Sequence, residues 1–76
     1  MVPEIGDLIH ILEGTHGYPI NWVPGMNTIR FYNGSMGILV EIGAPDSRGD
    51  EPRTFYTVAT PQGLVSIFEG FTRIIK

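Results

Sequence analysis

Apolar residues occur along the chain in short runs that glycine and proline separate. No stretch without glycine or proline is longer than eight residues, as in residues 53–60. Helices of globular proteins average about 10–14 residues, so this punctuation excludes a helical fold. Short apolar segments between turn residues are typical of β-strands, and we predict an all-β chain.

Five strands are expected, joined by turns of recognisable chemistry. Asn33-Gly34 favours a tight turn because both residues tolerate positive φ, and Pro61-Gln62-Gly63 predicts a second turn. Glu69-Gly70-Phe71 fits one turn of 3₁₀ helix. The strands are expected at residues 7–12, 35–42, 53–60, 64–68 and 72–76, with residues 28–32 forming either a short strand or the returning arm of a loop. A polar loop is expected at residues 43–52.

The direction of the side chains in residues 35–42 has two interpretations. With a regular pleat, the even-numbered apolar residues share one face, which would be the core face: Met36, Ile38, Val40 and Ile42. Gly37 could instead mark a bulge or a close backbone crossing, and a bulge there would turn Leu39 inward. The sequence leaves this register open.

Three segments resemble the SH3-like β-barrel family. Gly6-Asp7-Leu8-Ile9-His10-Ile11 resembles its opening strand, and residues 34–42 resemble its G-x-x-G-x-V-x-x-I second strand. Residues 55–58, 63–69 and 71–75 are similar to its final hairpin, 3₁₀ turn and closing strand. The resemblance implies one SH3-like barrel over residues 1–76, with about five antiparallel strands and a long loop after strand 1. Small proteins of tailed phages and of cyanobacteria often share this layout.

The resembling motifs carry no catalytic residue, so they imply an interaction module and not an enzyme. No serine lies in a Gly-x-Ser-x-Gly elbow. The two histidines, His10 and His16, are too few for a zinc site, which takes three or four protein ligands. We therefore expect no catalytic residue, no metal and no cofactor.

Composition narrows the class of partner. Five basic and eight acidic residues give a net charge of −3, which disfavours nucleic acid. The absence of cysteine excludes disulfides and thiolate chemistry. No apolar run approaches the roughly 18 residues of a membrane span, and no signal-peptide pattern is visible.

A cytoplasmic protein is expected, or one of the virion or host cytoplasm if it is phage-derived. A chain this short buries a marginal core, to which assembly into a homo-oligomer would add.

Aromatic residues gather in residues 15–32, the expected loop. This segment holds half of the eight aromatic residues: Tyr18, Trp22, Phe31 and Tyr32. Large rings with a polar edge favour interfaces. These four are therefore the candidate partner-binding residues, for a protein or for a second copy of the chain. The alternative is that they fold back as a second small core that caps one end of the barrel.

A KOW-like nucleic-acid-binding barrel is the alternative function. It predicts Arg30, Arg53 and Arg73 on one face with Tyr32 or Tyr56 between them, because such binding combines base stacking with phosphate contacts. The five basic residues are scattered along the chain. This scatter favours the protein-binding interpretation.

Overall fold

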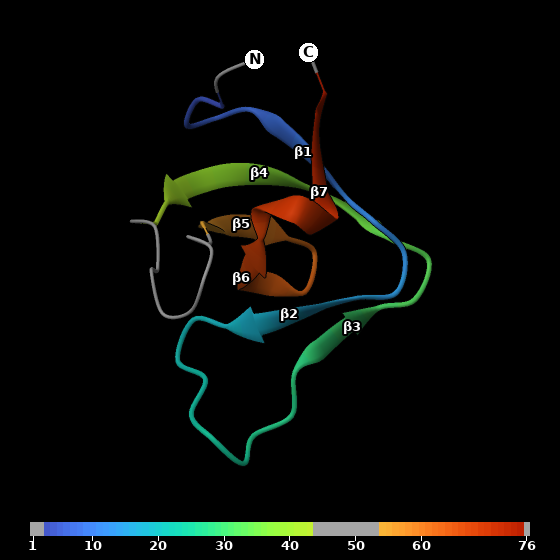
Figure 1. The fold of residues 1–76 in the computed structure, drawn as a ribbon, viewed down its shortest axis with the longest axis vertical. Coiled ribbons are helices and arrows are strands. Elements are labelled where there is room, and N and C mark those ends of the chain that lie inside the picture. The colour runs from blue at the N-terminus through green and yellow to red at the C-terminus, as the bar shows by residue number, and fades with distance from the viewer. Residues whose placement is uncertain (1–2, 44–53, 76) are drawn as a thin grey trace.

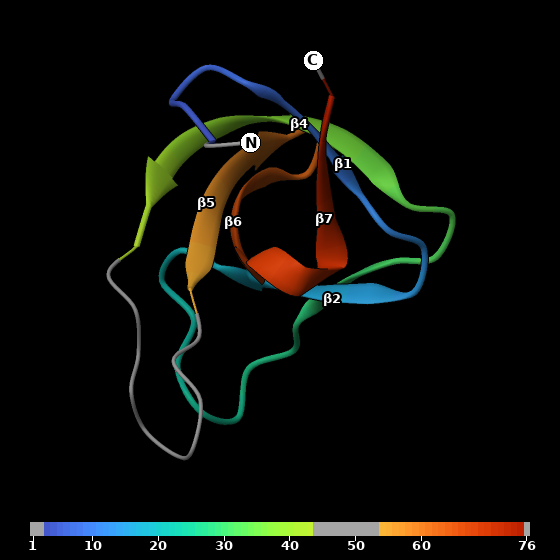
Figure 2. The same ribbon diagram turned by 45° about the horizontal axis from the view of Figure 1, so that its top comes forward.

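The chain folds into one curled antiparallel sheet of seven strands. The computed structural model describes residues 3–43 and 54–75. In spatial order the strands run β3-β2-β6-β5-β4-β1-β7, and the sheet curls into a half-barrel (Figures 1 and 2). The elements are β1 (Leu8–Ile11), β2 (Thr15–Pro19), β3 (Ile29–Phe31), β4 (Ser35–Ile42), β5 (Phe55–Thr60), β6 (Gly63–Phe68), the 3₁₀ turn η1 (Glu69–Phe71) and β7 (Thr72–Ile75).

The all-β prediction is confirmed, but the count of five strands is wrong. The additional strands, β2 and β3, lie between residues 15 and 32, and β3 is the short strand that was one of the two alternatives for residues 28–32. They form because Thr15, Gly17 and Phe31 point inward and pack beside β6. The predicted 3₁₀ turn at residues 69–71 is confirmed. The polar loop expected at residues 43–52 lies outside the described residues after residue 43, as do Arg53 and Lys76.

One long bent hairpin accounts for four of the strands. Pairing of β1 with β4 joins Leu8 to Ile38, and pairing of β2 with β3 joins Thr15 to Phe31. The two residue numbers of every such pair add to 46, so both pairs share one register. The ladder is interrupted only at residues 12–14 on one arm and 32–34 on the other, where both arms turn the same corner. The long hairpin therefore contributes a strand pair to each side of the half-barrel, β1–β4 to one side and β2–β3 to the other.

The tight turn predicted at Asn33-Gly34 is present, with Gly34 N bonded to Phe31 O at 3.1 Å, and it forms this corner. The strands on either side of it, β3 and β4, pair with β2 and β1 and not with each other. Gly34 has φ +75°, and a Cβ atom there would lie 2.7 Å from the carbonyl oxygen of Ile11. Only glycine meets both demands without strain. Local sequence thus predicted the turn and the positive φ of Gly34 correctly, whereas the pairing of β3 with β2 and of β4 with β1 comes from the tertiary structure.

The register of β4 is now settled. Leu39 is completely buried, whereas Ile38 is 44% exposed, so the regular-pleat interpretation that put Ile38 in the core is wrong. Gly37 faces inward, where a Cβ atom would lie 2.5 Å from Val58 Cγ1, so it marks a close crossing. The bulge itself falls between Leu39 and Glu41.

The core lies on the concave side of the sheet. Inward positions alternate along each strand, as expected for a half-buried sheet. Burial of each large apolar side chain contributes about 1.5–3 kcal/mol. The buried hydrophobic residues are Ile9, Ile11, Phe31, Leu39, Tyr56, Val58, Val65 and Ile67, with Ile29 and Ile74 packed against them.

Candidate binding surface

The four aromatic residues predicted to bind a partner do not form one cluster. Phe31 is only 2% exposed and belongs to the core, so it is unavailable to a partner, and its assignment to the binding surface is wrong. Tyr32 is 71% exposed and lies under the guanidinium group of Arg30, 4.9 Å from the ring centroid. Tyr18 and Trp22 contact each other edge to face, with ring centroids 5.0 Å apart. Of the predicted set, the structure therefore brings together only Tyr18 and Trp22.

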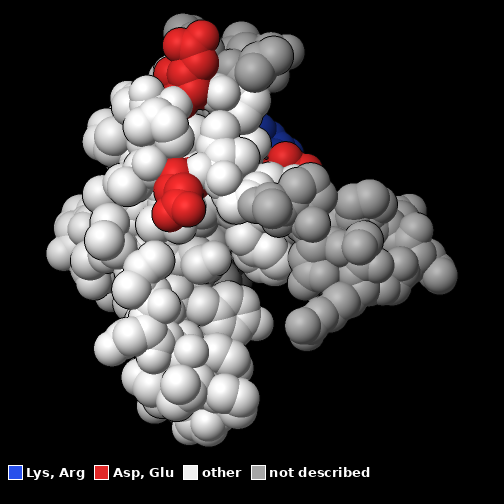
Figure 3. Space-filling view, turned by 90° about the vertical axis from the view of Figure 1, so that its left-hand side faces the viewer, with Lys and Arg blue, Asp and Glu red and all other residues white. Residues whose placement is uncertain are grey.

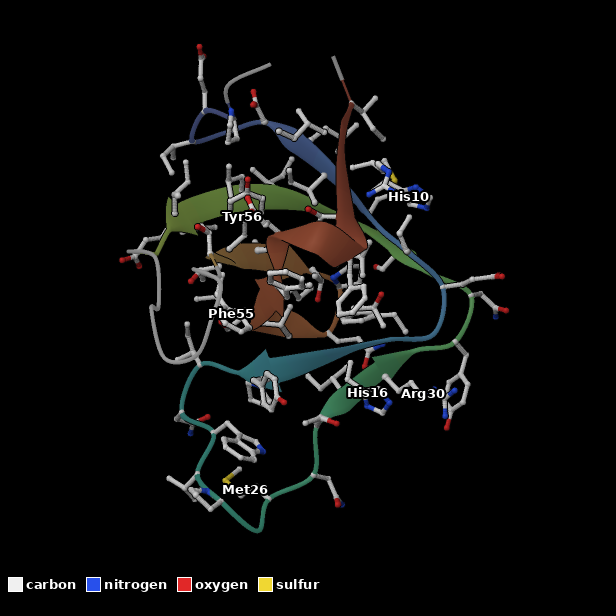
Figure 4. All side chains as sticks on the ribbon, viewed as in Figure 1. His10, His16, Met26, Arg30, Phe55 and Tyr56 are labelled. Carbon is white, nitrogen blue, oxygen red and sulfur yellow. The ribbon has the colours of Figure 1, made fainter. Side chains whose placement is uncertain are left out.

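Trp22 organises the loop that connects β2 to β3. Its indole Nε1 donates a hydrogen bond to the carbonyl oxygen of Met26, at 2.9 Å. Two turns complete the loop, with Trp22 N bonded to Pro19 O and Met26 N bonded to Val23 O. The loop thus has internal structure, as the interpretation of a second small core requires. Figure 4 shows Met26 at its far end, away from the sheet.

The same loop also exposes aliphatic side chains to solvent. Ile20 is 58% exposed and Val23 is 55% exposed. No charged residue occurs from residue 17 to residue 29. The lower part of the molecule in Figure 3, which this loop forms, accordingly shows no charged atoms. An uncharged segment with exposed apolar side chains is the surface type that marks interaction sites.

A groove lined by three phenylalanines, which was not predicted from the sequence, lies beside this loop. Phe55 of β5, Phe68 of β6 and Phe71 of η1 line an open groove of about 480 Å³. The ring centroids of Phe55 and Phe68 are 5.9 Å apart, and those of Phe68 and Phe71 are 5.5 Å apart. Phe71 remains 50% exposed. These rings form a continuous apolar floor that solvent reaches.

The corner between β1 and β2 supplies the opposite wall of this aromatic groove. Leu12, Glu13, Gly14, Thr15, His16 and Tyr18 line it on that side. His16 Nδ1 lies 2.9 Å from Thr28 Oγ1, a hydrogen bond that ties the wall to the return of the loop (His16 is labelled in Figure 4). Tyr18 borders the groove and also contacts Trp22. The aromatic groove and the β2–β3 loop therefore form one continuous surface through Tyr18.

The groove escaped prediction because Phe55 lies on β5, thirteen residues before Phe68, whereas Phe68 and Phe71 are three residues apart at the end of β6 and in η1. Phe55 and Phe68 are cross-strand partners of the β5–β6 hairpin. Thr60 pairs with Gly63 at the turn of this hairpin, and each step away from the turn pairs the next two residues, which brings Phe55 opposite Phe68. The turn residues were therefore the sequence signal from which this pair could have been predicted. Phe71 joins them because the 3₁₀ turn η1 follows β6 directly and places the Phe71 ring against that of Phe68.

Two of the three arginines expected on the basic face of a nucleic-acid-binding barrel lie in the part of the chain that the structure describes. Arg30 lies on β3 and Arg73 on β7, the two outermost strands of the sheet order. Tyr56 is buried and cannot stack on a base. Arg53 lies outside the part of the chain that the structure describes.

The described residues contain neither a candidate metal-binding cluster nor a candidate membrane-spanning helix. Within residues 3–43 and 54–75, no three histidine, aspartate or glutamate side chains are grouped so that they could hold a metal ion. In the same ranges, no helix has the length and hydropathy needed to cross a lipid bilayer. A comparison of the chain with protein-family models, with curated proteins and with solved structures finds no match.

The buried Tyr56 is expected to make the free energy of unfolding depend on pH in the alkaline range. Its hydroxyl group donates a hydrogen bond to Glu69 Oε2 at 3.3 Å. Burial, followed by the charge and hydrogen bond of Glu69, raises the pKa of Tyr56 above its ordinary value. The neutral hydroxyl is therefore favoured by folding, and its contribution is fully present below about pH 10 and lost as the pH rises through the raised pKa.

We expect urea unfolding of the wild type to require less denaturant as the pH rises above about 10. The variant Tyr56→Phe should lose part of this dependence, because it cannot ionise. Tyr32→Phe, at an exposed ring, should keep the wild-type profile. If the urea midpoint falls equally with rising pH in Tyr56→Phe and in the wild type, Tyr56 is not the group that causes the alkaline loss of stability.

Proposed function

We propose that the chain is a small SH3-like barrel that works as a non-enzymatic protein-binding module. Its ligand is an extended segment of a partner protein, which lies in the aromatic groove and against the β2–β3 loop. The observation that supports this proposal is the solvent-accessible floor of Phe55, Phe68 and Phe71, continuous with Tyr18. The residues of the earlier prediction that contribute are Tyr18 and Trp22.

The physical argument rests on apolar burial. Aromatic side chains dominate the energetics of protein interfaces because they bury a large area with few rotatable bonds. A groove of about 480 Å³ lies within the range of sites that hold small ligands or a few side chains. Polar groups on the wall, among them Glu13 and His16, would orient a ligand that lies on the phenylalanine floor.

A protein ligand fits this surface better than a nucleic acid. The groove wall contains a carboxylate, Glu13, and the described lining residues include no lysine or arginine. With a net charge of −3, the chain offers phosphate groups little attraction. A cytoplasmic location, and a relation to small phage or cyanobacterial proteins, remain expectations that accompany this proposal.

Selection from a random peptide library displayed on phage tests the proposal. We expect the wild type to enrich peptides rich in apolar residues. The variant Phe71→Ser should bind these peptides at least about tenfold more weakly, the loss of about 1.4 kcal/mol that one truncated interface ring commonly causes. Because Phe71 is half exposed, this variant should fold as the wild type does.

Tyr32→Ser is the matched control, because Tyr32 is an exposed ring outside the groove lining. It should bind as the wild type does. Failure to enrich any peptide, or equal losses for Phe71→Ser and Tyr32→Ser, would overturn the proposal.

Trp22→Ala separates the two interpretations of the β2–β3 loop. A binding surface predicts weaker peptide binding with unchanged thermal stability. A purely structural role of Trp22, through its contacts with Tyr18 and Met26, predicts a lower melting temperature and unchanged affinity below that temperature.

A further inference from the structure

The convex side of the sheet carries a second apolar surface, separate from the aromatic groove. On β4, Met36, Ile38 and Val40 are each 42–44% exposed. Strand pairing places Leu8 of β1 and Ala59 of β5 directly beside Ile38. We call these five residues the β4 crest. Figure 2 shows β4 arching along the outer, convex side of the half-barrel.

Charged residues flank the β4 crest with opposite signs at its two ends. At the Met36 end, strand pairing aligns His10 and then Arg73 with Met36. The Arg73 guanidinium donates a hydrogen bond to the carbonyl oxygen of Thr72 at 2.8 Å, which holds its charge on that flank. At the other end, Glu41 lies beyond Val40 and pairs with the polar residue Thr57. One end of the crest is therefore basic and the other acidic.

This arrangement is self-complementary under one two-fold axis. An axis that crosses β4 at Ile38, perpendicular to the strand, places the Arg73 end of one copy over the Glu41 end of its partner. A two-fold axis that lies in the plane of the contact but runs parallel to β4 would instead place Glu41 of one copy over Glu41 of the other. Like charges brought together in an interface are unfavourable, whereas opposite potentials favour association.

We propose that two copies of this chain associate through their β4 crests, with the two β4 strands antiparallel. Such a contact is isologous, since the same patch serves both copies. A contact between two convex crests is small and falls among interfaces below about 1,200 Å², which associate weakly. We therefore expect monomers in dilute solution and a substantial dimer population by about 1 mM.

Sedimentation equilibrium over a range of concentrations up to about 1 mM tests the proposal. For the wild type, the mass should rise from the monomer value of 8.4 kDa towards twice that value. Ile38→Lys should raise the dissociation constant by about 100-fold or more, because the two-fold axis brings both lysines together in an apolar contact. Ile20→Lys, at a more exposed position in the β2–β3 loop, should dimerise as the wild type does.

A wild type that stays monomeric at about 1 mM overturns the proposal. So does an Ile38→Lys variant that dimerises normally, or a dimer that Ile20→Lys abolishes. Circular dichroism checks that Ile38→Lys is folded. If it is not, Ile38→Thr keeps the β-branched shape, and it should still raise the dissociation constant by about tenfold.

Charge variants test the antiparallel orientation. Arg73→Glu and Glu41→Lys should each weaken the dimer. The double variant Arg73→Glu/Glu41→Lys should dimerise more tightly than either single variant, since it again places opposite charges together. A double variant weaker than both would contradict the antiparallel crest. Peptide binding by the aromatic groove should be unchanged in all three variants, so this result is independent of the proposed function.

Discussion

Replacing Leu39 with alanine is expected to lower the free energy of unfolding by about 3 kcal/mol. Leu39 is fully buried among the core residues of a 76-residue chain. A domain of this length is stable by roughly 4–11 kcal/mol, so the substitution would remove a large part of the total. Urea unfolding followed by circular dichroism, at a protein concentration low enough to keep the chain monomeric, measures the change.

Ile38→Ala is the matched control for Leu39→Ala. The two residues are neighbours on β4, and the substitutions remove similar apolar groups. Because Ile38 is 44% exposed, its replacement should cost less than about 1 kcal/mol in the monomer. The reverse ranking would show that Ile38 faces the core, as the regular pleat predicts.

The second large effect is expected at the corner of the long hairpin. Gly34→Ala should lower the free energy of unfolding by about 3 kcal/mol. Roughly 1–2 kcal/mol comes from an alanine at positive φ, and the remainder comes from the contact with the Ile11 carbonyl oxygen. A thermal or urea unfolding curve gives the value directly. If Gly34→Ala and the wild type have nearly equal free energies of unfolding, the two arms of the hairpin do not bend at Gly34.

Gly25→Ala separates backbone strain from steric contact. Gly25 also has positive φ, +97°, but nothing lies within 4 Å of the position of a Cβ atom. Its replacement should therefore cost about 1 kcal/mol, the backbone part alone. The difference between Gly34→Ala and Gly25→Ala then measures the close approach at the corner.

Turn chemistry and alternation predicted most strands because both are short-range properties. Residues 35–42 form β4 as expected, and residues 69–71 form the 3₁₀ turn. The turn at Asn33-Gly34 was predicted, but its place at a bend of a long hairpin was not, since positive φ at Gly34 suits the end of a two-stranded hairpin and a bend in a long arm equally well. What distinguishes the two is the partner of β3, and β2 is more than ten residues away in the sequence.

The candidate site was predictable only where its residues are neighbours in sequence. Tyr18 and Trp22 lie four residues apart, and they do contact each other. Phe31 lies in the same segment, yet it faces the core because the β2–β3 pairing turns it inward. The clustering of aromatic residues along the sequence therefore indicated the right region but not the exposure of each ring.

The sequence by itself determined the all-β class, the positions of most strands, and the uncharged segment that presents Tyr18 and Trp22. These follow from local preferences of glycine, proline and alternating apolar residues. The tertiary structure alone decided that Leu39 and not Ile38 faces the core, that four strands form one bent hairpin, and that Phe55, Phe68 and Phe71 line a groove together with the corner between β1 and β2. Each of these depends on contacts between residues far apart in the chain, such as the approach of Gly37 to Val58 and of Gly34 to Ile11.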